Sequence, residues 1–313
     1  MGEIKMSRIE FYYPSFTKKA VTFTIDDGNK KYDTIFLDIL RPAGIKGTFN
    51  LCSNISSPSM REELTTFYRG YGIANHCKHH PLVNLDGIEY RIAKERFDEA
   101  TADPAFIYPV EEAKGFYWAI QPNGWRQMVF EEDYLRFVDE GQRELREIFG
   151  EGAVRDYVWP YREMENERIR AYVKEKYRSV RKTGCTYDLD GFAIPRDKKS
   201  WSYNAVDTNL LEVMEKYENY PDDGELKFFA FGVHSYDFER DGKWDDLREF
   251  ARRYGNRPDT YWYASVEDIF DYEEAVRSVN IKEGMIENPG SLTVYLTVDG
   301  DRITIAPGKQ ITI

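Results

Sequence analysis

Two adjacent carboxylates follow an apolar, β-branched run early in the chain. The run VTFTI at Val21–Ile25 leads directly into Asp26 and Asp27, and a glycine comes next. Such residues favour a strand, and the glycine marks a turn. The acids are therefore expected at the carboxyl end of a buried strand, where two like charges repel unless a metal cation or a shared proton relieves them. A solvated Asp-Asp-Gly turn is the alternative interpretation.

The chain has only four histidines, and three of them fall in one stretch. His76 and His80 are four residues apart, so on one helical turn both would face the same way, which is a common spacing for metal ligands. His79 would point elsewhere on such a turn and is not expected to be a ligand. A surface turn that is rich in histidine is the alternative. The fourth, His234, ends an apolar strand, where it is either a core residue or a general acid.

These side chains could together bind a metal and catalyse hydrolysis. One carboxylate and two imidazoles leave open positions on a divalent ion, which is typical of a catalytic site that keeps a water. The second carboxylate is then available as a base. An Fe(II) oxygenase also uses two histidines and one carboxylate, but it gives no role to the adjacent second acid.

Seven short strands are expected to alternate with helices and to position these groups. They are Ala20–Ile25, Gly47–Leu51, Gly72–Asn75, Asp156–Trp159, Ser179–Thr183, Lys227–Val233 and Thr260–Ala264. The alternation indicates an α/β fold with a parallel sheet and right-handed crossovers, and seven units favour a closed or nearly closed barrel. The acids and histidines all follow carboxyl ends of strands, which is the face that holds the active site in such folds.

Two segments depart from this alternation. Residues 84–128 are expected to be an aromatic insertion near the mouth of the fold, in which Trp118 and Trp125 are candidates for a substrate cleft. Residues 279–313 alternate apolar and polar residues between Asp-Gly and Pro-Gly turns, which predicts a small antiparallel β appendage to a barrel of residues 1–278. The appendage is too short to be stable alone, so it should pack on the barrel or on a partner, and the second case would give a homo-oligomer.

The composition argues against several classes of partner. A net charge of −12 argues against nucleic acid, because phosphate binding needs a basic surface. Three cysteines, far apart and odd in number, do not form a disulfide framework. The chain has no apolar stretch long enough for a membrane span, and its N-terminus lacks the apolar core of a signal peptide. A cytoplasmic location is therefore expected, unless a leader has been removed.

Four motifs resemble those of the polysaccharide deacetylases, the fourth family of carbohydrate esterases. Thr24–Gly28 (TIDDG) resembles their Thr-Phe-Asp-Asp-Gly motif. Asn75–His80 (NHCKHH) resembles their His-Ser/Thr-x-x-His motif, with cysteine at the Ser/Thr position. Val158–Tyr161 (VWPY) resembles their Arg-x-Pro-Tyr motif, and Gly232–His234 (GVH) resembles their Leu-x-His motif. The resemblance extends over roughly residues 20–275.

The resemblance implies a distorted (β/α)7 barrel and a hydrolase that removes N- or O-linked acetyl groups from an acetylated oligo- or polysaccharide. It implies a divalent metal, with zinc as the expected ion, held by Asp27, His76 and His80. Asp26 would be the base that takes a proton from metal-bound water. The backbone N–H of Tyr161 would help to stabilise the oxyanion, and His234 would protonate the leaving amine or alcohol.

The third motif departs from the family pattern at one position. The arginine that holds the catalytic aspartate in the family falls on Val158 here. Another arginine is expected to take its place, unless the aspartate is held in some other way. The candidates are Arg155, Arg162 and Arg181.

The aromatic and acidic motif of the family is not matched cleanly either. Trp201 and Asp188 are candidates for the substrate cleft, and Asp188 or Asp190 is the candidate that orients His234. These gaps leave the substrate more open than the chemistry, because the metal and base positions are intact. Two alternatives therefore stay open. One is a C–N hydrolase of a small non-sugar amide or imide, and the other is a non-catalytic carbohydrate-binding protein on the same fold.

Overall fold

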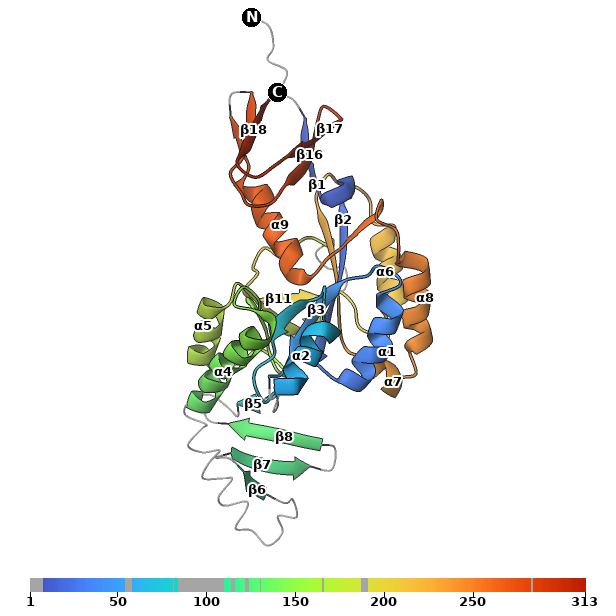
Figure 1. Ribbon diagram of the computed structural model, residues 1–313. Coiled ribbons are helices and arrows are strands. Elements are labelled where there is room, and N and C mark those ends of the chain that lie inside the picture. Colours follow the sequence, from blue (N-terminus) through green and yellow to red (C-terminus); the bar gives the residue numbers. More distant parts are fainter. Residues whose placement is uncertain are drawn as a thin grey trace, which may run out of the picture.

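Figure 1 shows the computed structural model of the chain. The structure describes residues 8–53, 58–80, 82–83, 110–113, 116–121, 124–129, 131–164, 166–186, 191–282 and 284–313. Among these residues, no helix combines the length and the apolar character needed to cross a membrane. The three cysteines are all free, as their number and spacing predict.

An all-parallel sheet forms the centre of the molecule. Its strands are β2 (Lys19–Asp27), β3 (Gly47–Leu51), β4 (Gly72–Asn75), β9 (Asp156–Val158), β10 (Ser179–Cys185), β11 (Trp201–Tyr203), β12 (Lys227–His234) and β13 (Tyr261–Tyr263). Seven of them pair in the order β11-β10-β9-β4-β3-β2-β12, and β13 pairs with the first part of β2. A parallel bridge between Ala205 and Phe231 brings the chain after β11 against β12 and closes the ring. The predicted distorted (β/α)7 barrel is confirmed.

Helices connect the strands and cover the outside of the barrel (Figure 1). They are α1 (Lys30–Leu40), α2 (Pro58–Phe67), α4 (Glu131–Phe149), α5 (Glu167–Lys176), α6 (Leu210–Glu218), α7 (Asp237–Arg240), α8 (Trp244–Tyr254) and α9 (Val266–Ser278), with a short 3-10 turn η1 (Pro14–Phe16) before β2. Aromatic rings fill the space between β2 and these helices. Phe23 on β2 meets Phe36 of α1, Phe231 of the neighbouring strand β12 and Phe250 of α8 edge-on, at centroid distances of 5.7, 4.8 and 5.4 Å. This packing fixes the strand whose end carries the two acids.

The strand β11 at Trp201–Tyr203 is not among the seven strands expected from the sequence. The strand is only three residues long, so it offers too few positions for an alternating pattern. It pairs with β10 across an irregularity in register between Arg181 and Cys185. The barrel therefore closes through β11, and the predicted strand near Thr260 lies beside β2 as an eighth member of the sheet.

The predicted antiparallel appendage forms two three-stranded sheets. Its strands are β14 (Asn280–Lys282), β15 (Met285–Asn288), β16 (Val294–Val298), β17 (Asp301–Ile305) and β18 (Lys309–Thr312). The N-terminal strand β1 (Ile9–Tyr12) also belongs here, because it pairs antiparallel with β16. The appendage packs on the barrel through α9, where the Tyr295 backbone N–H donates to the Tyr272 hydroxyl at 3.0 Å.

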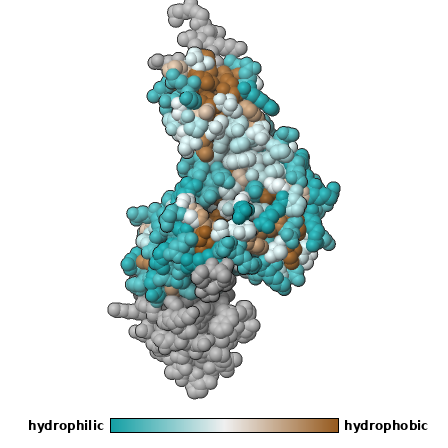
Figure 2. All heavy atoms as spheres, viewed as in Figure 1, coloured by the Kyte–Doolittle hydropathy of each residue, from teal (hydrophilic) through white to brown (hydrophobic). Residues whose placement is uncertain are grey.

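Apolar residues gather on the appendage, at the top of Figure 2. Four of the five large hydrophobic side chains that are exposed among the described residues lie in its segment of the chain, namely Ile281, Met285, Leu292 and Ile313. The homo-oligomer expected from the sequence stays a prediction.

The predicted insertion is described only in part. Strands β6 (Val110–Ala113), β7 (Phe116–Gln121) and β8 (Gly124–Val129) pair in an antiparallel sheet, and β5 (Leu82–Val83) joins its edge. The other residues of the segment lie outside the described part of the chain. So do the side chains of Trp118 and Trp125, and their predicted place in a cleft stays a prediction.

A network of charges lies at the start of α9, away from the acids of β2. Arg178 Nη2 lies 3.1 Å from Asp156 Oδ2, and Arg155 Nη2 lies 2.6 Å from Asp271 Oδ2. Glu267 in the first turn of α9 has a buried Oε2 with no hydrogen-bond partner among the described residues. Burial, followed by the charge of Asp156, raises the pKa of Glu267 to about 7.

We expect Glu267→Gln to change the pH dependence of stability. Because the folded pKa is about 7 and the ordinary value is 4.5, the carboxyl keeps its proton in the fold while the unfolded chain ionises. The wild type should therefore lose stability as pH rises through this interval. One pKa unit corresponds to about 1.4 kcal/mol of unfolding free energy. After a reduction for the partial exposure of Glu267, we expect the wild type to lose about 1–3 kcal/mol.

Urea unfolding at pH 5 and pH 8 measures this effect directly. The free energy of unfolding of the wild type should fall relative to that of E267Q between the two values. The same substitution at exposed Glu212 on α6 is the control, and it should follow the wild type. Parallel pH curves for the wild type and E267Q would contradict the prediction.

Candidate metal and catalytic site

The end of β2 gives its two acids different surroundings. Successive strand side chains point to opposite faces, and Asp27 also takes a positive φ of 75° as the strand turns. Asp26 is buried, and the sheet register places Asn50 of β3 on one side of it and His234 of β12 on the other. Asp27, by contrast, is partly exposed and faces the loop after β4.

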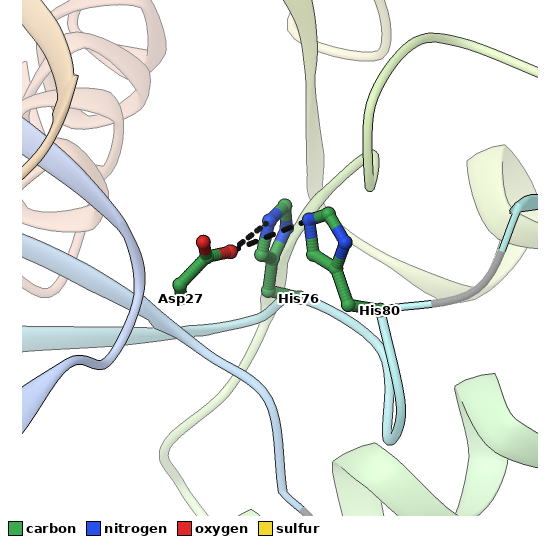
Figure 3. Close-up of side chains that lie close together, drawn as sticks. All are labelled: Asp27, His76 and His80. Carbon is green, nitrogen blue, oxygen red and sulfur yellow. Dashed lines mark ion pairs between the residues drawn. The ribbon is translucent and has the colours of Figure 1, made fainter. Parts of the chain in front are cut away.

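Asp27 and two histidines converge on one point (Figure 3). Asp27 Oδ1 lies 3.3 Å from Nε2 of His76 and 3.3 Å from Nε2 of His80. Asp27 Oδ1 and His76 Nε2 are both buried without a hydrogen-bond partner among the described residues. Atoms bound tetrahedrally to one zinc ion, each about 2.0–2.1 Å from it, would lie about 3.3 Å apart. The three residues therefore fit a divalent cation.

The two histidines do not share a helical turn, so that expectation is wrong. The segment after β4 is a loop in which Cys77 and His80 have φ values of 64° and 50°. The Cys77 backbone N–H donates to Asn75 Oδ1 at 3.0 Å, which turns the chain immediately after the strand. The loop still brings the rings of His76 and His80 together, with centroids 4.7 Å apart.

The surroundings of both histidines suit metal binding. His76 Nδ1 lies 3.0 Å from the carbonyl oxygen of Val158. A carbonyl oxygen can only accept, so Nδ1 donates to it and Nε2 is the ring nitrogen that faces Asp27. Burial lowers the pKa of His80 to about 4, so this ring is neutral near pH 7.

Asp26 is held by an arginine and an amide. Arg181 Nη2 donates to Oδ1 of Asp26 and, at 2.5 Å, to Oδ2, and this guanidinium is only 1% exposed. Asn50 Nδ2 donates to Oδ1 at 2.7 Å. Burial alone would raise the pKa of Asp26, but Arg181 and the neighbouring histidines outweigh it and hold the pKa below its usual value.

The sheet register explains how Arg181 replaces the arginine that the third motif lacks. Val158 on β9 and Arg181 on β10 are direct neighbours across the two strands. The positive charge therefore comes from the next strand at the same level of the barrel. The ring of Tyr203 lies 5.2 Å from the guanidinium carbon and packs against it. Of the other two candidates, Arg155 pairs with Asp271 in the network at α9.

His234 lies between the two acids and a third carboxylate. Its Nδ1 donates to Asp237 Oδ2 at 2.9 Å, and its Nε2 lies 3.8 Å from Asp27 Oδ2. Burial alone would lower the pKa of His234, but the hydrogen bond to Asp237 and the charges of the β2 acids raise it to about 9.

Asp237 is the residue that the structure shows bonded to Nδ1 of His234, and the prediction of Asp188 or Asp190 for the orienting role stays a prediction. Both of those residues lie outside the described part of the chain, and so does the predicted place of Asp188 in the cleft. Sequence reasoning missed Asp237, although an acid three residues beyond a strand-end histidine is within reach of its ring.

A cavity of about 330 Å³ opens beside these groups. Its walls are Asp26, His76, His80, Trp159, Tyr161, Thr183, Tyr203, Val206, Asp207, Gly232, Val233, His234, Tyr236 and Asp237. Tyr161 stands at the rim, 40% exposed, with its ring 4.4 Å from that of His80. A larger residue would not fit at Gly232, because a Cβ there would lie 2.2 Å from the ring of Tyr203.

Trp201 is not among the walls of the cavity, which corrects its prediction as a cleft residue. Its side chain is 3% exposed and packs edge-on against Phe228 and Phe270, at centroid distances of 5.8 and 5.4 Å. Its position on β11 directs it into the core between the barrel and α9. The aromatic walls are formed instead by Trp159, Tyr161, Tyr203 and Tyr236.

Comparison with solved structures finds similar chains of low sequence identity. The Xyl-CE4 domain of a multidomain xylanase from the hindgut metagenome of Trinervitermes trinervoides has 13% identity and a TM-score of 0.46, over 83% of this chain and 93% of that chain. A polysaccharide deacetylase from Bacillus cereus has 15% identity and a TM-score of 0.42, over 79% and 91%. A family 4 acetyl xylan esterase from Clostridium thermocellum, in complex with a cobalt ion, has 12% identity and a TM-score of 0.45, over 82% and 92%.

Comparison with family models identifies the family. A search of curated proteins finds no match. The model that describes polysaccharide deacetylases matches residues 14–180, which is more than half of the 313 residues. The matched region contains both β2 acids and the histidine loop after β4. The chain belongs to the polysaccharide deacetylase family.

Proposed function

We propose that this protein is a metal-dependent hydrolase that removes acetyl groups from an acetylated oligo- or polysaccharide. The observation that carries the proposal is the unlike environment of two adjacent acids. Asp27 faces the Nε2 atoms of two histidines, whereas Asp26 faces a buried guanidinium. Carbohydrate binding alone needs neither arrangement, so this contrast favours an enzyme over a non-catalytic binding protein.

Asp27, His76 and His80 are the proposed ligands of the metal, and zinc is the proposed ion. Two imidazole nitrogens and one carboxylate oxygen are a common donor set for catalytic zinc, and they leave a position open. The separations of 3.3 Å support this assignment. When bound, the ion supplies a Lewis acid that acidifies a water molecule and polarises an acyl carbonyl.

Asp26 is the proposed general base. It is ionised because its pKa is lowered, and Arg181 and Asn50 fix both of its oxygens in place. It would take a proton from the water that attacks the acyl carbon. The backbone N–H of Tyr161 is the proposed donor to the oxyanion that forms.

His234 is the proposed general acid. Its raised pKa keeps the ring protonated near pH 7, and Asp237 fixes the ring through Nδ1. Nε2 is then free to give a proton to the amine or alcohol as the C–N or C–O bond breaks and acetate leaves. The aromatic walls of the cavity suit stacking against a sugar ring, which supports a carbohydrate as substrate.

We expect Asp26→Asn to lower acetate release by roughly 10²–10⁴-fold, because a general base contributes about this much. The amide keeps the shape of the side chain, so the metal content should stay that of the wild type. The matched control is Asp38→Asn on the exposed face of α1, which should keep full activity.

The assay should cover acetylated xylo- and chito-oligosaccharides, peptidoglycan fragments and a cyclic ureide. Acetate release from a carbohydrate supports the proposal. Turnover of the ureide alone would favour the alternative, a C–N hydrolase of a small amide or imide. Full activity of D26N on the substrate of the wild type would overturn the role of Asp26.

We expect His80→Ala to lose bound zinc, because it removes one of three proposed ligands. His79→Ala is the matched control, since His79 lies one residue away and its ring packs against Phe137. The zinc content of both variants is measured by elemental analysis after dialysis. Equal zinc in the two variants would contradict the ligand assignment.

We expect Arg181→Met to destabilise the metal-free protein by about 3–5 kcal/mol, because it leaves the buried charge of Asp26 without a partner. In the D26N background the same substitution should cost clearly less, since no buried charge remains. Urea unfolding of the four proteins in a double-mutant cycle measures the coupling. Equal losses in both backgrounds would show that Arg181 does not act through Asp26.

A further inference from the structure

The four residues from His234 to Asp237 lie at the end of β12 and form hydrogen bonds to one another, to α1 and to Asp27. His234 and Asp237 form the hydrogen bond described above. Ser235 Oγ donates to Asp33 Oδ1 at 2.5 Å, and Tyr236 donates through its hydroxyl to Asp27 Oδ2 at 2.8 Å. The first contact stays within the segment and the second reaches helix α1, whereas the contact of Tyr236 reaches Asp27, a proposed metal ligand.

Tyr236 donates its hydrogen bond to Oδ2 of Asp27, the oxygen that does not face His76 and His80. Oδ1 is the atom 3.3 Å from both imidazole nitrogens, and Oδ2 accepts from the phenol. The ring of Tyr236 is also stacked on the ring of His234, with centroids 4.8 Å apart and planes inclined by 17°. One side chain on the cavity wall therefore contacts both the proposed ligand and the proposed acid.

We propose that Tyr236 is a positioning residue that keeps Asp27 bound to the metal through Oδ1 alone and holds the His234 ring beside it. A carboxylate can bind a metal through one or both oxygens. In binding through both, Oδ2 would have to share its electron density between the ion and the phenol, so the phenol disfavours it and preserves an open position for water or substrate. The inference rests on the proposed metal site and goes beyond the ligand set.

The segment has an anchor that does not depend on the phenol. Asp33 is fully buried in α1 and accepts from Ser235 and, at 2.6 Å, from the hydroxyl of Tyr68. These bonds fix the backbone beside Tyr236 to the helix. Removing the Tyr236 hydroxyl should therefore change the metal carboxylate while the fold stays intact.

The test is Tyr236→Phe, which keeps the stacked ring and removes only the hydroxyl. The cobalt(II)-loaded variant should show weaker visible absorption than the wild type, because a carboxylate bound through both oxygens raises the coordination number. Zinc affinity, measured by competition with a chelator, should fall roughly 10–100-fold, as is typical when the hydrogen-bond partner of a ligand is removed. Tyr32→Phe on α1, outside the cavity, is the control and should match the wild type in both.

Unfolding of the metal-free proteins checks that Y236F has kept its fold. An intact Y236F with the cobalt spectrum and zinc affinity of the wild type would overturn the proposal. This result is distinct from failure of the proposed function, which would appear as a wild type that binds metal and releases no acetate. In that case the cobalt spectra would still decide whether Tyr236 controls how Asp27 binds.

Discussion

The buried ion pair between Arg181 and Asp26 is the interaction on which the rest of the site depends. Asp26 and Asp27 are consecutive, so without a partner both would place negative charge at one strand end. Arg181 balances the charge of Asp26 inside the barrel, and Asn50 orients the same carboxylate by a hydrogen bond. The other acid is left to face the Nε2 atoms of two histidines, where a cation can be held. Two neighbouring acids are thereby suited to two different roles, the proposed metal ligand and the proposed base.

Much of the barrel and half of the site could be predicted from the sequence because both depend on local patterns. The apolar runs at Gly47–Leu51 and Gly72–Asn75 are strands with the predicted bounds. A parallel sheet then requires that residues at carboxyl ends of strands meet on one rim. That rule is sufficient to bring Asp27 together with His76 and His80, although the loop that carries the histidines is not helical.

The supporting residues could not be predicted, because they depend on register and on packing between distant segments. The sequence narrows the replacement arginine to three candidates, and only the alignment of β9 with β10 places Arg181 beside Val158. Asp237 and Tyr236 act through a tight turn after β12 whose shape no periodicity reveals. Trp201 belongs to a three-residue strand, too short to show which way its side chain points.

X-ray diffraction from a zinc-loaded crystal, recorded at the zinc absorption edge, tests the division of roles between the two acids most directly. We expect one anomalous peak, in contact with Asp27, His76 and His80. Asp26 should stay paired with Arg181 and should not touch the ion. A peak bridged by both acids, or an ion bound elsewhere in the cavity, would contradict the account.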